Sequence, residues 1–280
     1  MNRLAFAALL VAGVVCWTNV DAQDVPDCYA PKELTSHRPR PNLSVAVLLD
    51  DTTLLNSELQ KAVSTEIKRF IRKGAELHIF RFSAFVDGRY TSRAFSASFA
   101  SPLPEGALYD IRKPVAKSFE RCMEIQVIRA NQAITAILQR YFSDASSSIS
   151  KSEIVAAVRD LGDNVALRMA AQKRVLLMVS DMLENSELTS FYLRGGVRKI
   201  DPAAELAKVG KASLFTNLVG MNVYVIGAGV LPVDQKGGSA LYRDEATMAA
   251  LRDFWKQYLE RSSGTLREFG QPLLLAPIGP

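Results

Sequence analysis

Two apolar runs of this chain end in carboxylates and hydroxyls, the side chains that could hold a hard cation or act on a phosphate. Val45-Ala-Val-Leu-Leu leads into Asp50-Asp51-Thr52-Thr53, and Val175-Leu-Leu-Met-Val leads into Ser180-Asp181. Oxygen ligands without nitrogen or sulfur suit Mg²⁺ or Mn²⁺. If the two runs are neighbouring parallel strands, Asp50, Thr52 and Asp181 converge beyond their carboxyl ends.

The order of the predicted elements places these acids at one edge of a sheet. Unalternated apolar runs at 43–49, 174–179 and 221–226 indicate strands buried on both faces. Helical periodicity at 55–73, 202–218 and 244–262 separates them. Such alternation predicts an α/β domain with a doubly wound, mostly parallel sheet and helices on both faces. Sites in such sheets form beyond the carboxyl ends of the strands.

Short sequence signals predict further turns, helices and strands around this sheet. Asp87-Gly88, between strand patterns at 75–85 and 89–99, predicts a hairpin into an antiparallel edge strand. Ser150 with Glu153 predicts a capping box that starts a helix toward 161, and a further helical stretch reaches 172. Leu273-Leu274-Leu275 predicts a last short strand.

The chain divides into five predicted parts. These are a signal peptide (1–22), an extended, proline-containing strap (23–42), one domain (43–265), a helical insertion in it near 105–149, and a C-terminal tail (266–280).

The first 22 residues have the pattern of an export signal. Arg3 precedes the apolar run Leu4–Trp17, and Val20-Asp-Ala22 offers small residues for cleavage before Gln23. We therefore expect an exported protein, in the periplasm of a Gram-negative bacterium, with no integral membrane span after cleavage. The alternative is a lipoprotein modified at Cys16, although Val15 stands where a small residue is wanted.

Two cysteines, Cys28 and Cys122, remain after the signal. An even pair in an exported protein predicts one disulfide, which would tie the strap to a distant helix. The alternative is two buried thiols. Neither cysteine has the C-x-x-C spacing of a zinc site or a thioredoxin-like protein.

Composition and motifs argue against nucleic-acid and nucleotide partners. The net charge is +5 over 280 residues, and no basic run is interleaved with stacking aromatics. Gly227-Ala-Gly229 is followed by Pro232 where a dinucleotide fingerprint has its third glycine. The sequence around Lys211 lacks the first glycine of a P-loop.

The order of elements and four short motifs resemble the von Willebrand factor A-like (vWA) family over about 43–264. The resemblance is carried by Asp50-x-Thr52 after the first strand, Ser152-x-Ile154-x-x-Ala157-Val158, Lys173-Arg-Val-Leu-Leu-Met-Val-Ser-Asp181, and Gly220-Met-Asn-Val-Tyr-Val-Ile-Gly227. Residues 105–149 match nothing in the family.

The resemblance implies a metal-ion-dependent adhesion site made of Asp50, Thr52, Ser152 and Asp181, holding Mg²⁺ or Mn²⁺. Two positions depart from the family. Leu54 stands where the last hydroxyl of the first motif belongs, and Met182 follows the final Asp where glycine is common. The alternative is that Asp50 and Asp181 cap helices or order their loops. A second register, Asp51-x-Thr53, stays open.

The leading hypothesis is a non-enzymatic protein-protein interaction module of the bacterial envelope, with exposed loops at 143–150, 184–199 and 231–243 setting specificity. One alternative is a metal-dependent phosphoester hydrolase with Asp50 as nucleophile, although Thr52 stands where that chemistry needs a second Asp. Another is a metal-free structural subunit of a secretion or conjugation assembly. Nothing resembles a Ser-His-Asp set.

Overall fold

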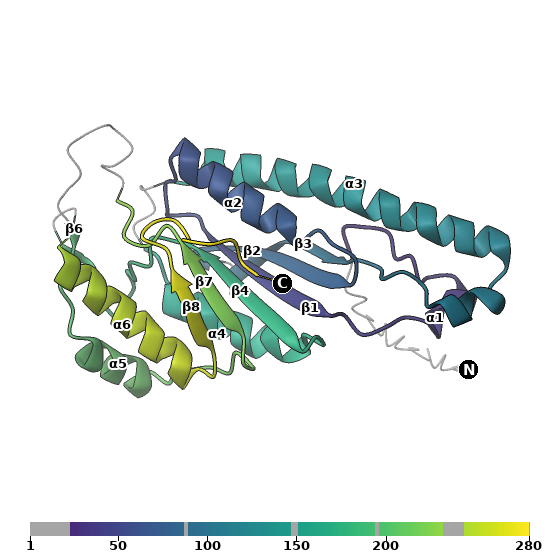
Figure 1. Ribbon diagram of the computed structural model, residues 1–280. Helices are drawn as coiled ribbons and strands as arrows, with labels where there is room; N and C mark the ends of the chain where they lie inside the picture. Colours follow the sequence, from purple (N-terminus) through teal and green to yellow (C-terminus); the bar gives the residue numbers. More distant parts are fainter. Residues whose placement is uncertain (1–22, 87–88, 147–150, 194–195, 232–243, 280) are drawn as a thin grey trace, which may run out of the picture.

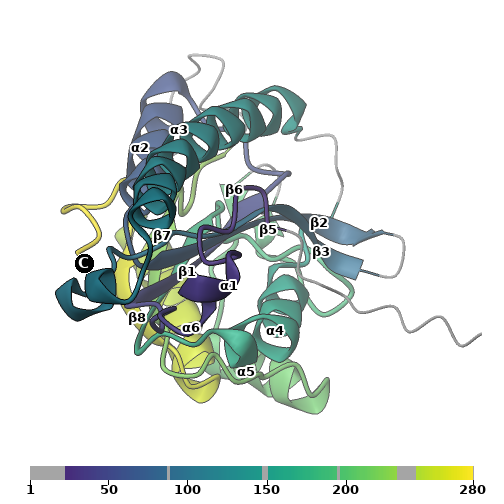
Figure 2. The same cartoon turned by 90° about the vertical axis from the view of Figure 1, so that its right-hand side faces the viewer.

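A six-stranded sheet forms the centre of the protein, with strand order β3-β2-β1-β4-β7-β8 (Figures 1 and 2). The computed structural model describes residues 23–86, 89–146, 151–193, 196–231 and 244–279, so the predicted signal peptide and Cys16 lie outside the described residues. The strands are β1 (Leu43–Asp50), β2 (Ala75–Val86), β3 (Arg89–Ser98), β4 (Lys173–Val179), β7 (Asn222–Ile226) and β8 (Thr265–Phe269).

The predicted doubly wound α/β class is confirmed. Within this sheet β3 runs antiparallel to β2, and the other neighbouring strands pair in parallel. Val86 pairs with Arg89, which leaves two residues for the turn; the predicted Asp87-Gly88 turn itself lies outside the described residues.

The register of the central strands aligns their ends. Leu43 of β1 pairs with both Ala75 of β2 and Lys173 of β4, and Leu49 pairs with Val179. The residues that follow β1 and β4 therefore emerge side by side. Every residue of β1 is buried, as its unalternated apolar pattern requires.

Helices cover both faces of the sheet (Figure 1). One face carries α2 (Ser57–Arg69) and α3 (Lys113–Asp144), and the other carries α4 (Ile154–Asn164), α5 (Pro202–Lys211) and α6 (Glu245–Arg261). Each face has its own apolar core, to which the helices contribute one stripe of side chains. Among the described residues no helix is long and apolar enough to cross a membrane.

The predicted insertion is mainly one long helix, α3, which lies along α2 and then continues past it (Figure 1). Its N-terminal half meets α1 (Lys32–Thr35), a short helix inside the strap, and the 3₁₀ helix η1 (Glu105–Tyr109). The predicted disulfide is confirmed: Cys28 of the strap is bonded to Cys122 of α3, with the two Cα atoms 5.6 Å apart.

Three local predictions were wrong. The last strand is β8, and the predicted strand at 273–275 is absent: Leu273 and Leu274 are half-buried and Leu275 is 97% exposed. The helix α4 ends at Asn164, and a 3₁₀ turn, η2 (Ala166–Arg168), stands where a further helical stretch to 172 was predicted. The helix α5 ends near Lys211, because Ser213 adopts a left-handed φ of 55° that a helix cannot continue.

Candidate functional site at the strand tips

The four residues predicted as metal ligands lie together at the carboxyl ends of β1 and β4. Asp50, Thr52, Ser152 and Asp181 are all buried. They come from β1, the turn after it, the segment before α4, and the turn after β4. The parallel register explains why residues far apart in the sequence meet here.

The Asp50 carboxylate is the centre of this cluster. Its Oδ1 accepts hydrogen bonds from the Thr52 backbone N–H at 3.0 Å and from the Thr52 hydroxyl at 2.6 Å. Its Oδ2 accepts from the Ser152 hydroxyl at 3.1 Å and from the Ser180 hydroxyl at 2.7 Å. Three hydroxyls from three segments therefore surround one carboxylate.

Ser180 was not predicted as a site residue, although it precedes Asp181 in the sequence. It is fully buried, and its Oγ also accepts from the Met182 backbone N–H at 2.9 Å. Leu54 lacks the hydroxyl that the vWA pattern has at that position, and Ser180 brings a third hydroxyl to Asp50 from another strand. Thr53, also buried, accepts a hydrogen bond from the Asp181 backbone N–H at 3.0 Å.

Asp181 is held by its own turn and by a distant tyrosine. Its Oδ1 accepts from the Leu183 backbone N–H at 2.8 Å, and its Oδ2 accepts from the Tyr192 hydroxyl. Tyr192 belongs to β5 (Tyr192–Leu193), which pairs with β6 (Gly196–Val197) in a small separate hairpin. No spacing in the sequence pointed to this tyrosine.

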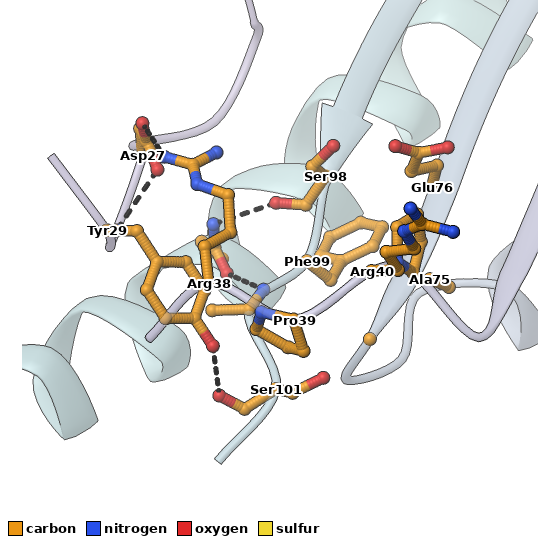
Figure 3. Close-up of a pocket in the computed structure, with 14 residues that line it drawn as sticks. Asp27, Tyr29, Arg38, Pro39, Arg40, Ala75, Glu76, Ser98, Phe99 and Ser101 are labelled. Carbon is orange, nitrogen blue, oxygen red and sulfur yellow. Dashed lines mark hydrogen bonds and ion pairs between the residues drawn. The ribbon is translucent and has the colours of Figure 1, made fainter. Parts of the chain in front are cut away.

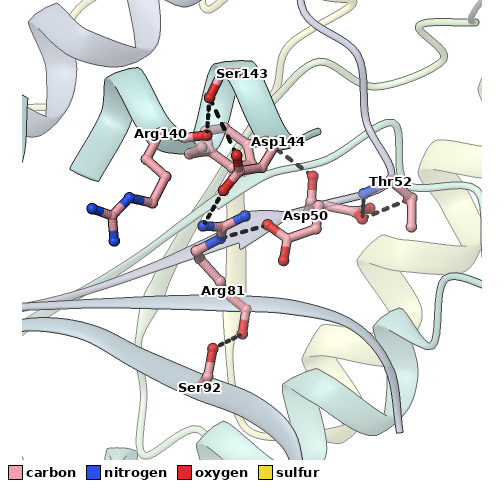
Figure 4. Close-up of polar contacts among 9 residues, drawn as sticks. Asp50, Thr52, Arg81, Ser92, Arg140, Ser143 and Asp144 are labelled. Atoms are coloured by element: carbon pink, nitrogen blue, oxygen red, sulfur yellow. Dashed lines mark hydrogen bonds and ion pairs between the residues drawn. The ribbon is translucent and has the colours of Figure 1, made fainter. Parts of the chain in front are cut away.

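The register Asp50-x-Thr52 is the one that builds the cluster, and Asp51 points elsewhere. Its carboxylate pairs with Arg81 of β2 at 2.8 Å, and Arg81 also reaches Asp144 of α3 at 3.3 Å (Figure 4). Tyr141 of α3 donates its hydroxyl to the Asp50 backbone carbonyl at 3.0 Å. These contacts fix the C-terminal end of α3 against the end of β1.

Met182 occupies the second position that departs from the family pattern. It keeps the left-handed conformation that glycine would adopt there, with φ 61°, and its side chain is fully buried. The Trp255 indole N–H donates to the Met182 carbonyl at 2.8 Å. This conformation costs a non-glycine residue roughly 1–2 kcal/mol, which side-chain burial and the indole contact offset.

The Gly227-Ala-Gly229 loop after β7 forms a wall of the same site. Gly227 has φ 103°, and a Cβ there would lie 3.1 Å from the Ser180 carbonyl. The Gly229 N–H donates to the Asp181 carbonyl at 2.8 Å. These glycines serve close packing at the strand tips.

The segment 184–193 crosses the strand tips, so the predicted exposed loop at 184–199 is partly a structural element. The Asn185 and Ser152 backbones form a two-way bridge at 2.9 and 3.0 Å. Phe191 is buried against the ring of Phe254, with centroids 5.0 Å apart. This segment holds Ser152 and Tyr192 in place.

Glu184 replaces the predicted capping box of α4. Its Oε2 accepts from the Val155 backbone N–H at 2.9 Å, while Glu153 makes no side-chain cap. Ser150 lies outside the described residues. Burial raises the pKa of Glu184 to about 7, against the hydrogen bonds that favour its charged form.

Two buried carboxylates give the cluster its electrostatic character. Burial, followed by the charge of Asp50, raises the pKa of Asp181 to about 8. Burial also raises the pKa of Asp50, against its four hydrogen bonds. Within the described part of the chain, neither Asp50 nor Asp181 forms an ion pair with Lys or Arg. The pair is neutralised either by protons or by a cation.

The donor set fits a hard divalent cation. All candidate donors are carboxylate or hydroxyl oxygens, and two acids lie side by side without a cationic partner. The described residues hold no cluster of three or more His, Cys, Asp or Glu side chains suited to a metal. A cation here would therefore depend on the hydroxyls of Thr52, Ser152 and Ser180 as well as on the two acids.

Comparisons with known proteins give distant likenesses. No family model and no curated protein matches the chain. An aerotolerance-related membrane protein from Bacteroides fragilis aligns at 12% identity over 82% of this chain and 92% of its own, with a TM-score of 0.37. BatB from Bacteroides thetaiotaomicron aligns at 13% identity over 81% and 89%, with a TM-score of 0.36. The pilus adhesin SpaC from Lactobacillus rhamnosus GG aligns at 11% identity over 79% and 30%, with a TM-score of 0.34.

These structural similarities are too low to assign the fold. The fold is assigned from the strand order and connections of this chain. Fold and site together define a doubly wound α/β protein with a buried oxygen-donor cluster at the tips of its central strands.

Proposed function

We propose that this protein is a non-enzymatic interaction module of the bacterial envelope that binds a partner protein at the tips of its central strands. The observation that supports it is the convergence of Asp50, Thr52, Ser152, Ser180 and Asp181, from three segments, into one buried oxygen cluster. A doubly wound fold presents its loops at this end, where a rigid scaffold positions them for recognition.

The two acids and three hydroxyls would hold Mg²⁺ or Mn²⁺. When bound, a divalent cation supplies a positive centre that accepts a carboxylate oxygen of the partner. In its absence, hydroxyl and backbone donors keep both acids in place. Tyr192 and the rest of the segment 184–193 would set which partner reaches the site.

A metal-free version of the same role has a specific observation in its favour. All four carboxylate oxygens of Asp50 and Asp181 already accept hydrogen bonds from the protein. In that case the cluster orders the strand tips, and the protein acts as a structural subunit of an envelope assembly. A hydrolase is not favoured, because the Thr52 hydroxyl is bonded to Asp50 where an acid/base residue would be needed.

The first test is thermal unfolding with Mg²⁺, with Mn²⁺ and with chelator. A cation that binds only the folded state adds about 2.7 kcal/mol at 100 times its Kd. We expect a higher melting temperature that Asp181→Asn abolishes and that the exposed control Asp110→Asn keeps. If the melting temperature does not rise, the protein binds no cation here, and the metal-free version of the role is favoured.

The partner is tested by site-specific photo-crosslinking in cells. A crosslinker at Leu193, which is 57% exposed beside the site, should capture a protein, and one at Ile128, 56% exposed on α3, should not. Asp181→Asn should remove the Leu193 adduct. An unchanged adduct would contradict binding at the strand tips. Turnover of phosphoesters that Asp50→Asn abolishes would replace the proposal with the hydrolase.

A further inference from the structure

The end of the molecule opposite the strand tips carries a projecting unit. The 32 residues of α3 span about 48 Å, whereas the eight residues of β1 span about 26 Å. The C-terminal end of α3 is fixed at the strand tips, where the Ser146 N–H donates to the Asp51 carbonyl at 3.0 Å. The N-terminal half of α3 therefore extends beyond the start of the sheet, beside α1 (Figure 1).

We call this unit the overhang: strap residues 26–38 together with residues 103–125. Its small core is made of Cys28, Tyr29, Leu34, Ala107, Ile111 and Phe119, which pack with Ala100 just after β3. The Cys28–Cys122 disulfide closes it covalently. A separate core and a cross-link make the overhang a rigid projection of the domain.

The overhang exposes two adjacent large apolar residues at its outer end. Tyr109 is 90% exposed and Leu108 is 49% exposed, in η1 directly before α3. A tyrosine combines an apolar ring with a polar hydroxyl, and such side chains favour the boundary between lipid and water. Neither residue belongs to the small core of the overhang.

Exposed cations gather around the same end. The Asn42 N–H donates to the Gly74 carbonyl at 2.9 Å, so the end of the strap lies against the α2–β2 connection. Figure 3 shows Arg40 of the strap close to Ala75 and Glu76 at the start of β2. The exposed basic side chains are Lys32, Arg40, Arg69, Lys73, Lys113 and Lys117.

Acidic side chains at this end only partly offset that charge. Arg38 pairs with Asp27 at 2.6 Å, and Arg112 pairs with Glu33, so these two pairs cancel. The remaining exposed acids of the overhang are Glu105, Asp110, Glu120 and Glu124, the last beside the exposed Arg121. These four acids balance the four remaining cations of the overhang, and Arg69 pairs with Glu66. The excess of positive charge at this end comes from the strap and the end of α2, where Arg40, Lys68, Arg72 and Lys73 face the one acid Glu76.

The chain enters the domain near this end. Gln23, the first described residue, lines a pocket of about 270 Å³ with Glu76 near the start of β2 and Ser98 at the end of β3. The apolar run Leu4–Trp17 precedes it in the sequence. A leader that continues into Gln23 would therefore join the domain on the side of this end.

We propose that the overhang, together with Arg40 and the α2–β2 connection beside it, is a peripheral membrane-binding surface for anionic phospholipid bilayers. Tyr109 and Leu108 enter the headgroup boundary, and the surrounding lysines and arginines contact the lipid phosphates. The strand tips then face away from the membrane, toward a partner. The proposal uses no residue of the strand-tip cluster and stands independently of it.

Tryptophan substitution tests the proposal at the proposed contact. Tyr109→Trp is compared with Leu193→Trp, an exposed position at the other end, both in a Trp17→Phe background. The buried Trp255 contributes the same emission to both variants. With vesicles containing phosphatidylglycerol, the emission of the tryptophan introduced at position 109 should shift to the blue and be quenched by brominated lipid. The emission of the one introduced at position 193 should not change, even if the leader itself anchors the chain.

Charge and lipid composition complete the test. Lys73→Gln and Lys113→Gln should each weaken vesicle partitioning about fivefold, as expected for about 1 kcal/mol per basic residue. Phosphatidylcholine vesicles should give little response. Equal quenching at both positions, or none at position 109, would overturn the proposal. A response of the Tyr109→Trp variant to polyglutamate or single-stranded DNA, but not to vesicles, would also overturn it, in favour of an acidic macromolecule.

Discussion

At the strand tips, polar side chains are fully buried and satisfy one another, whereas the overhang keeps its polar groups at the surface and is closed by a covalent bond. The tips can use hydrogen bonds because two apolar cores surround them and exclude water. The overhang has only a small core, and small cores need cross-links. The comparison shows that hydrogen bonds stabilise the strand tips and a disulfide stabilises the overhang. Different substitutions should therefore destabilise the two regions.

The largest expected loss of stability follows from a change in the overhang. Replacing both Cys28 and Cys122 by serine opens a loop closed over a sequence separation of 94. The chain-entropy model predicts a loss of about 4 kcal/mol. Urea unfolding of the oxidised protein and the double variant measures it. The variant should keep any cation response of the strand tips; losing it would show that the two ends are not independent.

The next effect is on the pH dependence of the strand tips. The folded pKa of Glu184 is raised to about 7, so the folded state binds a proton that the unfolded state releases above its ordinary pKa. The resulting stabilisation is complete below pH 4.5 and is lost as pH rises through 7. Asp181 extends the loss toward pH 8.

Glu184→Gln should flatten this slope between pH 4.5 and 7 by up to about 3 kcal/mol. Chemical unfolding across this pH range, with chelator present, checks it. Glu187→Gln, at an exposed position in the same segment, is the control. A slope that the Glu184 variant leaves unchanged would show that the folded state holds no proton there.

A third prediction concerns the base of the overhang, where α3 meets the strap and the end of β3. The buried Gln126 amide accepts from the Ala100 N–H at 2.9 Å and donates to the Pro26 and Ser98 carbonyls at 2.7 and 3.1 Å. Gln126→Leu leaves these backbone groups unpaired and should cost about 2 kcal/mol. Gln132→Leu, at an exposed position of the same helix, should stay within about 0.5 kcal/mol. Equal losses in urea unfolding would contradict this assignment.

The smallest expected effect concerns the hydrogen bond from Tyr192 to Asp181 at the strand tips. Tyr192→Phe removes the hydroxyl that donates to Asp181 and should cost about 1 kcal/mol without cation. If this hydroxyl competes with a cation for Asp181, the variant should show a larger Mn²⁺-induced rise in melting temperature than the native protein. Tyr109→Phe, on the exposed overhang, should change neither quantity. A smaller rise in the Tyr192 variant would mean that the hydroxyl supports cation binding.

The sheet was predictable because its central strands are apolar on both faces. The runs at 43–49, 174–179 and 221–226 match β1, β4 and β7 within about one residue. The edge strand β8 was missed because its Thr265-Leu-Arg-Glu-Phe269 pattern has few apolar residues. The apolar run at 273–275 was predicted as the strand instead, although Leu273 and Leu274 are only partly buried against the core and Leu275 is exposed.

The site was predictable where its residues follow strands, and not where they come from other segments. Asp50, Thr52 and Asp181 meet because strand ends align in a parallel sheet, whereas Ser152 precedes α4 and was expected only from the family resemblance. Tyr192 and Glu184 act from a segment whose path over the strand tips depends on packing such as that of Phe191 on Phe254. No local sequence pattern predicts the path of a segment that is fixed by such distant packing.

The length of α3 has a mechanical consequence. One end of this helix is linked to the strap through Cys122, and Tyr141 near its other end holds the backbone of Asp50. A continuous helix is stiff along its axis, so a small rotation or axial shift of one end displaces the other. A load applied to the overhang would therefore reach the backbone carbonyl of Asp50 through one rigid strut, without unfolding anything between them.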